Sequence, residues 1–371
     1  MLIQLNIFLS LAISFTIVFF VIPKIITVSK IKKLFDIPNH RSAAKHVVPT
    51  LGGISIFAGF VISIVIASNS YNIDELKYML AGIIAMFFVG LKDDIIGLAA
   101  KKKFIIQIVM AFYLVIIGNY RITNFHGILG VEEISYIAGT ILSVIAIVGI
   151  INAVNLIDGI DGLASGIGLL ISLVYGIWFL DAGDYIYAIT CFSLTGSLIA
   201  FSLYNVFGTT NKIFMGDTGS LILGTIVALL TIHFNEFNPV GNVSHGLPAI
   251  SLAIIIVPVV DTIRIFAIRL SQGKSPFTPD MNHIHHQVLR LTGNHLKASF
   301  IIIAVNAVII FLAFSLIDTL GNNNLFILLF ISGFILAGIP AWILKFQNKT
   351  VQERENKSIY ALSIFLKKLK N

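Results

Sequence analysis

The stretch of sequence most suggestive of chemistry is 152–162, which reads Asn-Ala-Val-Asn-Leu-Ile-Asp-Gly-Ile-Asp-Gly. Its polar side chains recur at every third position: Asn152, Asn155, Asp158 and Asp161. The stretch joins two apolar runs and contains no basic residue. Carboxylates beside an apolar phase are costly without a counter-charge. We therefore expect a divalent cation, or a Lys or Arg from elsewhere in the fold, to lie next to them.

Two backbone conformations are compatible with this spacing. In a helix, every third residue rotates by about 60°, so the four side chains would sweep across one broad face. The two Asp-Gly dipeptides favour a break in the helix equally well. A calcium-binding EF-hand is excluded, because the positions after Asp158 do not supply ligands at the required spacing and no glutamate closes the loop. Capping and turn formation alone would also explain the polar residues.

Two further acidic motifs flank other apolar runs. Asp93 and Asp94 are adjacent and precede three lysines at 101–103. Neighbouring carboxylates repel each other, which suits them to metal binding or proton acceptance; an acidic helix end compensated by Lys92 is the alternative. Asp217, followed by Thr-Gly-Ser, is suited to an anion site at the start of a helix, or to a simple helix cap.

A third group is basic. His283, His285 and His286 follow a Ser-Pro-Phe-Thr-Pro-Asp segment, and their spacing matches no zinc signature. In a basic loop, imidazoles are suited to contacting phosphate or shuttling protons, although a solvated loop would look similar. Asp261 and Arg264 are three residues apart, which predicts an ion pair; Arg264 could instead reach an anionic substrate.

The composition predicts an all-α polytopic membrane protein. Of the 371 residues, 57% are hydrophobic and 12% are charged, which is not typical of a soluble domain. The apolar runs have the length needed to cross roughly 30 Å of hydrocarbon as helices. We expect about eleven such helices, near residues 4–28, 51–68, 77–91, 104–118, 135–152, 163–180, 185–204, 219–233, 248–268, 298–317 and 325–344. Residues 1–345 would form one domain, followed by a basic cytoplasmic tail, 346–371.

The distribution of positive charge predicts the orientation. Of the 25 Lys and Arg residues, 21 lie in alternate loops and the C-terminal tail, and 2 lie in the opposite loops. Because cytoplasmic loops carry the excess of Lys and Arg, the N-terminus is expected outside and the C-terminus in the cytoplasm. This distribution explains the net charge of +7 without nucleic acid as a partner. All the motifs above fall on the basic, cytoplasmic side.

Acidic residues beside lysines and histidines at one membrane face indicate chemistry on phosphates with Mg²⁺. Bringing two phosphate anions together at the rim of a membrane requires a metal and cationic side chains to offset their repulsion. Five segments, in this order, resemble the polyprenyl-phosphate N-acetylhexosamine-1-phosphate transferase family over residues 1–345. They are Pro-Thr-Leu-Gly-Gly at 49–53, Asp-Asp at 93–94, the 152–162 stretch, Phe-Met-Gly-Asp-Thr-Gly-Ser at 214–220 and His-Ile-His-His at 283–286.

This resemblance implies that a polyprenyl phosphate attacks the β-phosphorus of a UDP-amino sugar and releases UMP. It implies Mg²⁺, or Mn²⁺ in its place, bound by Asp217 with Asp94 in support. Asp93 would orient or deprotonate the lipid phosphate. The other implied catalytic residues are Asp158, Asp161, His283, His285 and His286, the histidines contacting the diphosphate. The implied substrate-binding residues are Lys45, Thr50, Asn152, Asn155, Asn205, Phe214 and, as above, Arg264.

The histidine loop favours one branch of this family. The branch that transfers phospho-N-acetylmuramoyl-pentapeptide for peptidoglycan typically has three contiguous histidines, whereas Ile284 interrupts them here. We therefore expect transfer of N-acetylglucosamine 1-phosphate to undecaprenyl phosphate at the cytoplasmic face of the bacterial inner membrane, initiating a surface glycan. A homodimer is compatible with this function. The alternative from another class is a transporter or flippase, which should instead place its polar residues near the bilayer midplane.

Overall fold

A computed structural model describes residues 2–36, 48–68, 71, 74–237, 247–275 and 280–369. Its first half contains α1 (Leu2–Lys32), β1 (Phe35–Asp36), β2 (Val48–Pro49), α2 (Gly52–Ala67), the 3₁₀ turn η1 (Asp74–Leu76), α3 (Lys77–Ile96), α4 (Ala100–Ile116), β3 (Asn124–Ile128), β4 (Val131–Glu133) and α5 (Tyr136–Ile157). Its second half contains α6 (Leu163–Ala182), α7 (Tyr185–Phe207), α8 (Gly216–Glu236), α9 (Pro248–Ile254), α10 (Ile256–Ser271), α11 (Ile284–Thr292) and α12 (His295–Leu369).

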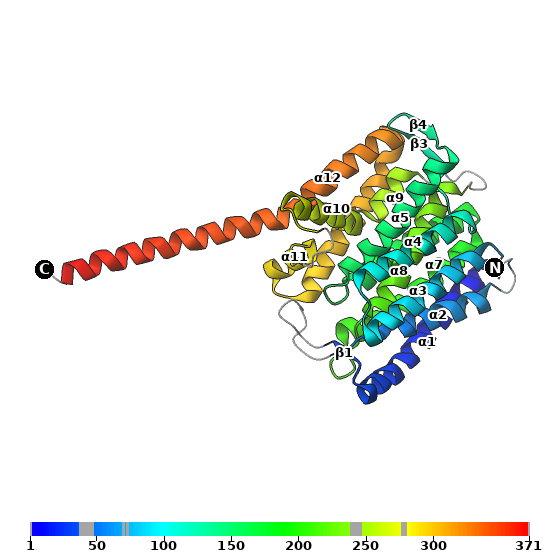
Figure 1. The fold of residues 1–371 in the computed structure, drawn as a ribbon, viewed down its shortest axis with the longest axis horizontal. Helices are drawn as coiled ribbons and strands as arrows, with labels where there is room; N and C mark the ends of the chain where they lie inside the picture. The colour runs from blue at the N-terminus through cyan, green and yellow to red at the C-terminus, as the bar shows by residue number, and fades with distance from the viewer. Residues whose placement is uncertain are drawn as a thin grey trace.

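The bundle in Figure 1 confirms a helical, polytopic membrane protein. Each of the eleven predicted stretches contains a helix, and α12 covers the last two of them. Within the described ranges, six helices are long and apolar enough to cross a membrane, or seven if α9 and α10 together form one bent span. The two antiparallel hairpins, β1–β2 and β3–β4, and the short amphipathic α11 were not predicted.

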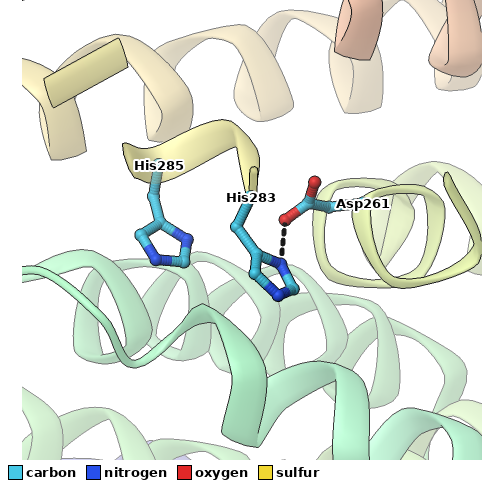
Figure 2. Close-up of side chains that lie close together, drawn as sticks. All are labelled: Asp261, His283 and His285. Atoms are coloured by element: carbon cyan, nitrogen blue, oxygen red, sulfur yellow. Dashed lines mark hydrogen bonds and ion pairs between the residues drawn. The ribbon is translucent and has the colours of Figure 1, made fainter. Parts of the chain in front are cut away.

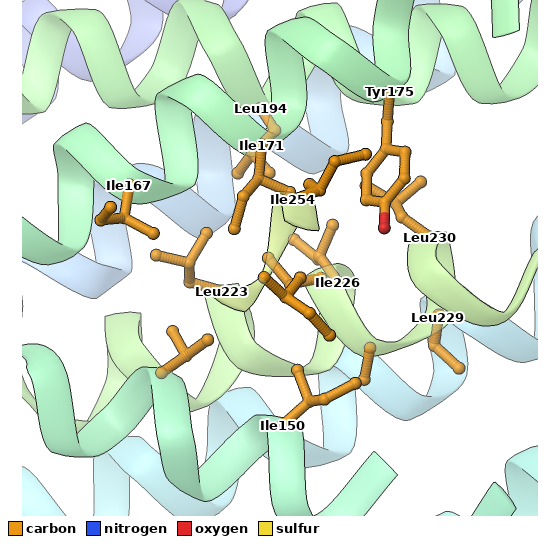
Figure 3. Packing of buried hydrophobic residues seen from close by; sticks show 14 of the residues in the cluster. Ile150, Ile167, Ile171, Tyr175, Leu194, Leu223, Ile226, Leu229, Leu230 and Ile254 are labelled. Atoms are coloured by element: carbon orange, nitrogen blue, oxygen red, sulfur yellow. The ribbon is translucent and has the colours of Figure 1, made fainter. Parts of the chain in front are cut away.

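Helix α8 lies at the centre of the bundle. Its residues from Thr218 to Ile232 are all buried, and it packs against α2, α3, α5 and α6. Figure 3 shows the apolar contact, in which Leu223 and Ile226 of α8 lie between Ile150 of α5 and Ile171 of α6. This burial on all sides explains why the segment is uniformly apolar after its first few residues.

Glycines allow α2 and α3 to approach the first turn of α8 closely. A Cβ atom on Gly53 would lie 2.1 Å from the backbone nitrogen of Gly219, and one on Gly90 would lie 2.4 Å from Cα of Thr218. Neither distance is tolerable for a real side chain, so glycine is required at both positions. The close approach brings the polar C-terminal end of α3 to the start of α8, where the candidate site is built.

A sharp break separates α9 from α10, whose axes are bent by 82°. The break interrupts the helical hydrogen bonds around Ile255, and the fully buried side chain of Asn306 on α12 replaces two of them. Its Nδ2 donates to the Ile254 carbonyl at 3.2 Å, and its Oδ1 accepts from the Val257 N–H at 3.4 Å. Such backbone groups need a partner when buried, so Asn306 stabilises the direction in which α10 leaves the break.

A second polar cluster lies at the opposite end of α8 from the candidate site. Asp184 begins α7 by accepting a hydrogen bond from the Tyr187 N–H at 3.2 Å. Its other oxygen lies 2.6 Å from Nε2 of His233, near the C-terminal end of α8. The His233 ring stacks on Tyr187 with 3.5 Å between centroids. These contacts join α7 to α8.

Helix α12 is interrupted once and then continues beyond the bundle. Gly321 adopts φ 70° and ψ 167°, which divides the helix between the last two predicted spans. The C-terminal part of α12 projects away from the other helices in Figure 1. A cytoplasmic location for this basic tail stays a prediction.

Candidate active site

Asp94 holds the first turn of α8. Its two carboxylate oxygens accept hydrogen bonds from the backbone N–H groups of Asp217 and Thr218 at 2.8 and 2.9 Å, and from the Thr218 hydroxyl at 2.5 Å. An anion at a helix N-terminus satisfies unpaired N–H groups and the helix dipole, which stabilises the helix by about 1 kcal/mol. Gly216, at φ 70°, allows the chain to turn into the helix at this point. Asp94 therefore positions Asp217, which follows Gly216 in the first turn of α8.

Lys103 of α4 lies between two of the predicted acidic residues. Its Nζ pairs with Asp93 and lies 2.9 Å from Oδ1 of Asp217. The other oxygen of Asp93 accepts from the Leu98 N–H at 2.6 Å, and Asn155 Nδ2 donates to Asp217 Oδ1 at 2.8 Å. Lys103 thus places a positive charge between Asp93 and Asp217, whereas the cation predicted beside the 152–162 stretch is Lys212, which contacts Asp161.

The 152–162 stretch combines the two predicted conformations. Asn152 and Asn155 lie on α5, which ends at Ile157, and Asp158 and Asp161 lie in the turn before α6. Burial, together with the like charges of neighbouring carboxylates, raises the pKa of the Asp158 carboxyl to about 7. Those neighbours are Asp217, Asp94 and Asp161. The acidic residues therefore form one electrostatically coupled group.

Asp161 belongs to a second cluster within the site. Its Oδ2 lies 2.6 Å from Nζ of Lys212 and 3.2 Å from Nδ1 of His295. Burial opposes ionisation, but hydrogen bonds from His295 and Lys212 hold the pKa of Asp161 below its usual value. Asp161 is therefore an anion that is already neutralised, unlike Asp158.

Asn205 joins the turn before α6 to the loop before α8. Its Oδ1 accepts from the Gly162 N–H at 2.7 Å, and its Nδ2 donates to the Ile213 carbonyl at 2.9 Å. Both polar ends of the side chain thus contact the protein backbone. The predicted contact of Asn205 with a substrate stays a prediction.

The 49–53 segment pairs with the same loop. The Phe214 N–H donates to the Pro49 carbonyl at 2.8 Å, and the Gly52 N–H donates to the Phe214 carbonyl at 3.0 Å. A Cβ on Gly216 would lie 2.1 Å from the Thr50 carbonyl oxygen, so these two segments are in direct contact. Thr50 and Phe214 are thus brought to the start of α8, whereas Lys45 lies outside the described residues.

The histidine loop lies against α10. The predicted ion pair forms, since Arg264 Nη2 donates to Asp261 Oδ1 at 2.8 Å. The same nitrogen donates to the Asn282 carbonyl at 2.7 Å, so the predicted contact of Arg264 with a substrate stays a prediction. His283 Nδ1 lies 2.9 Å from the other oxygen of Asp261 (Figure 2).

His285 connects this loop to the 152–162 stretch. A Cβ on Gly159 would lie 2.2 Å from Nε2 of His285, so the ring packs directly on that glycine. Burial and the neighbouring His286 lower the pKa of His285 to about 3, which keeps the imidazole neutral at physiological pH. Nδ1 of both His285 and His286 is buried without a hydrogen-bond partner among the described residues. These nitrogens are therefore available to a ligand.

A cavity of about 410 Å³ joins these groups. It is lined by Ala100, Lys103, Phe104, Gln107, Asn152, Asn155, Leu156, Gly159, Phe266, Arg269, Asp280, His283, His285 and His286. Of the predicted site residues, only Asn152, Asn155, His283, His285 and His286 are part of this lining among the described residues. Asp93 and Asp217 reach the cavity only through Lys103, and Asp161 and Phe214 lie near Lys212 instead. Polar groups above an apolar wall are suited to a ligand that has both an anionic and an apolar part.

Four polar or charged lining residues were not predicted as site residues: Lys103, Gln107, Arg269 and Asp280. Gln107 is fully buried and accepts from Asn152 Nδ2 at 2.6 Å, while Arg269 Nε donates to Asp280 at 2.8 Å. Lys103 and Gln107 are four residues apart and therefore share a helix face. A glutamine in an otherwise apolar stretch was the signal that could have identified that face.

The site and its scaffold define a class of enzyme. Residues 76–235 match the pattern of glycosyl transferase family 4, a range that contains most of the acidic residues described above. Together with the extended similarity below, this match shows that the chain belongs to that family.

Particular relatives narrow the class. The chain is 32% identical over 280 residues to the undecaprenyl-phosphate alpha-N-acetylglucosaminyl 1-phosphate transferase of Salmonella typhi, covering 75% of this chain and 74% of that protein. It is 28% identical over 341 residues to the transferase of the same name from Yersinia pestis, with 87% and 90% coverage. The corresponding protein of Haemophilus influenzae is 32% identical over 280 residues, with 74% and 77% coverage.

Proposed function

We propose that this protein transfers N-acetylglucosamine 1-phosphate from UDP-N-acetylglucosamine to undecaprenyl phosphate, releasing UMP. The names of its relatives support this acceptor and this sugar phosphate. The main observation behind the proposal is that Asp93 and Asp217 both form an ion pair with Lys103. These ion pairs lie beside a cavity that is lined by histidines and Arg269 on one wall and by apolar residues on another.

The acidic residues fit a magnesium ion. Carboxylate and amide oxygens are the ligands that Mg²⁺ prefers, and Asp217 presents a carboxylate with 35% of its side chain exposed. The raised pKa of Asp158 reflects its burial and, after that, repulsion within the acidic group, which a divalent cation would offset. Asp217 is the principal proposed ligand, with Asp94 in support and with Mn²⁺ as a substitute. When bound, the metal would neutralise charge on the diphosphate of the donor.

The acceptor phosphate would meet Asp93 and Lys103. In the reaction, a phosphate oxygen of the lipid attacks the β-phosphorus of the donor, and the bond between that phosphorus and the UMP oxygen breaks. Lys103 offers a positive charge to the incoming anion, and a lysine that pairs with the phosphate would free the carboxylate of Asp93. Asp93 is thus placed to accept a proton from, or to orient, the lipid phosphate. Phe104 and Leu156 provide the apolar wall beside it.

The donor would extend from the histidine loop to the Lys212 cluster. Arg269 supplies hydrogen-bond donors for the diphosphate, and the three histidines are proposed to contact it. Phe214 and Asp161, which lie near Lys212, are proposed to contact the uridine, with Lys45 and Asn205 beside them. Asp158, Asn152 and Asn155 would form the polar floor between these two regions.

The proposed topology has eleven transmembrane helices, an outer N-terminus and a cytoplasmic C-terminus, in the bacterial inner membrane. Support comes from the helices in all eleven predicted stretches and from the division of α12 at Gly321. The site is built from the C-terminal ends of α3 and α5 and the N-terminal ends of α4 and α8, as expected for antiparallel neighbours that meet at one face. We also propose that the active site is cytoplasmic, because the basic loops lie on this side, and that the reaction starts a lipid-linked surface glycan.

A muramoyl-pentapeptide donor is the competing proposal within the family. Ile284, which interrupts the histidines, begins α11 and lines an apolar cavity between α10, α11 and α12. The relatives named above are all N-acetylglucosaminyl 1-phosphate transferases, which favours the simpler sugar. A transporter is disfavoured because the polar and charged groups of the candidate site lie at one end of the bundle rather than at its midplane.

Purified protein in detergent would be given UDP-N-acetylglucosamine, undecaprenyl phosphate and MgCl₂. UMP release and a sugar-diphosphate lipid are expected, and both should be absent without the lipid acceptor. A parallel reaction with UDP-N-acetylmuramoyl-pentapeptide tests the competing donor. Folded protein that releases no UMP from any UDP-amino sugar would contradict the proposed function.

A further inference from the structure

Three buried side chains of the histidine loop and α10 lie close enough to suggest a metal site. Asp261, His283 and His285 are all buried, and their ligand-type atoms lie within 4.8 Å of one another. Figure 2 shows His283 directed at the carboxylate of Asp261 while His285 lies further along the loop. The contacts around the three residues decide between a metal site and a hydrogen-bonded network.

The charges around this group argue against a cation. Arg264 donates to Asp261 Oδ1 at 2.8 Å, and the Ile284 N–H donates to the same oxygen at 3.1 Å. On the other side, Nη2 of Arg269 lies 3.4 Å from Nε2 of His283. A metal ion would lie between two guanidinium groups and would compete with their hydrogen bonds. Asp261 is therefore already neutralised by the protein itself.

The same contacts determine which ring nitrogen of His283 carries a proton. A carboxylate only accepts hydrogen bonds, so the ring nitrogen that faces Asp261 must carry the proton, and this nitrogen is Nδ1. The other nitrogen, Nε2, is then left to face Arg269 and the cavity that His283 lines. Asp261 also anchors the start of α11 through Ile284. One buried carboxylate thus sets both the tautomer of His283 and the position of the loop.

Asp261 also affects the turn that carries Asp158, because His283 and His285 connect the two by packing. The rings of His283 and His285 stack with centroids 5.5 Å apart, and His285 rests on Gly159 of the 152–162 stretch. A rotation of His283 would therefore disturb the contact between the histidine loop and the turn that carries Asp158. This coupling depends on packing contacts and requires no change in the protonation of any group.

We propose that Asp261 is a positioning residue of the transferase, which holds His283 with its proton on Nδ1 and its Nε2 against Arg269, beside the substrate cavity that both residues line. The proposal rests on the proposed function only for its kinetic consequence. Partners that orient a functional histidine typically change activity by about 10- to 100-fold when removed. Asp261 is thus expected to matter for turnover without touching the substrate.

The kinetic test uses Asp261→Asn, which keeps the size of the side chain but offers His283 a donor group. UMP release per folded protein should fall by about 10- to 100-fold. The matched control is Asp184→Asn, which alters the other buried Asp–His pair at the opposite end of the bundle. We expect it to keep turnover within about twofold of wild type while lowering the midpoint of thermal unfolding.

A double variant separates positioning from general damage. If Asp261 acts through His283, Asp261→Asn combined with His283→Gln should be no slower than His283→Gln alone. Losses that multiply, or an Asp261→Asn protein with wild-type turnover, would overturn the proposal. So would one transition-metal ion per wild-type chain that is absent from Asp261→Asn, because it would show a metal site in place of the network.

A spectroscopic measurement is independent of turnover. In protein labelled with ¹⁵N-histidine, the signal assigned to His283 by His283→Gln should report a proton on Nδ1, and that proton should move to Nε2 in Asp261→Asn. A proton already on Nε2 in the wild-type protein would overturn the proposal. Absence of UMP release in the wild-type protein, with the expected histidine signals, would instead contradict only the transferase function.

Discussion

Two buried Asp–His pairs, at opposite ends of the bundle, use the same residue types in different ways. At the end away from the site, Asp184 contacts Nε2 of His233, and the ring stacks on Tyr187. At the site, Asp261 contacts Nδ1 of His283, and the remaining nitrogen faces Arg269 and the cavity. The first pair lies away from the cavity, whereas the histidine of the second pair lines the cavity and also contacts Arg269, another residue of its lining.

The difference extends to the residues around each pair. Near Asp184, Thr123 donates to Glu236 at 2.5 Å and Tyr120 contacts Tyr187 at 2.6 Å. Arg121 Nε and Asn235 Oδ1 are buried at this end without partners among the described residues, but no group of like-charged carboxylates surrounds them there. Near the cavity, Gln107 Nε2 and the Nδ1 atoms of His285 and His286 are buried without partners among the described residues. Unsatisfied buried polar groups cost free energy, so their accumulation beside like-charged carboxylates distinguishes a functional site from a structural network.

The strongest test of this distinction is Asp217→Asn. The change keeps a side chain that can pair with Asn155 but removes the charge proposed to bind the metal, so turnover should fall more than about a hundredfold. The control is Asp181→Asn, an exposed aspartate at the other end of the bundle, which should retain wild-type activity. UMP release measured over a range of MgCl₂ concentrations checks both. An unchanged Mg²⁺ requirement in Asp217→Asn would remove Asp217 from the metal site.

The next largest effect is expected from Lys103→Met. It removes the cation that lies between Asp93 and Asp217, so the carboxylates repel each other and the incoming phosphates lose a positive partner. Turnover should fall about a hundredfold. Lys102→Met is the matched control, because that neighbouring lysine is exposed and should tolerate the change. Equal losses of turnover in the two variants would show that the positive charge of this segment matters, and not the contact of Lys103 with Asp93 and Asp217.

A smaller effect is expected where only the packing changes. In Gly159→Ala the new methyl group would lie 2.2 Å from His285 Nε2, so the ring must move and turnover should fall about tenfold. Gly149→Ala, earlier in α5, meets nothing within 4 Å and should leave turnover unchanged. The turnover of both variants is compared, after thermal unfolding has shown that the two proteins are equally stable. Wild-type turnover in Gly159→Ala would show that the contact of His285 with the turn is dispensable.

The sequence predicted the helical class and the residues of the acidic group because both depend on local patterns. Apolar run lengths determine spans, and adjacent or regularly spaced carboxylates are visible without a fold. The partners of those carboxylates were not predictable in the same way. Lys103 is one of three consecutive lysines, and only the helical phase of α4 decides which of them meets Asp93 and Asp217.

The sequence also did not show which role each residue of a motif has. Asp94 looks like Asp93 in the sequence, yet one caps α8 and the other pairs with Lys103. Likewise, Asp158 and Asp161 repeat the same Asp-Gly dipeptide, but only Asp161 is neutralised by Lys212. Such differences arise from segments that are distant in sequence, such as the loop before α8, so spacing alone does not contain them.

Asn306 shows how far from the site this dependence reaches, and it gives the smallest expected effect on turnover. It is a buried asparagine on α12 whose two hydrogen bonds bridge the break between α9 and α10. Asn306→Ala leaves the Ile254 carbonyl and the Val257 N–H without their partner, so unfolding should become easier by about 1–3 kcal/mol.

Because α10 carries Asp261 and Arg269, a looser break should also lower turnover, but by less than about tenfold, which separates it from changes within the site. Asn324→Ala is the control, since Asn324 lies on the same helix, is exposed and contacts only the carbonyl one turn earlier. Thermal unfolding and UMP release are measured on both proteins. A drop in stability with fully retained turnover would show that the direction of α10 is held by the histidine loop itself, so that the Asp261 network organises the break rather than depending on it.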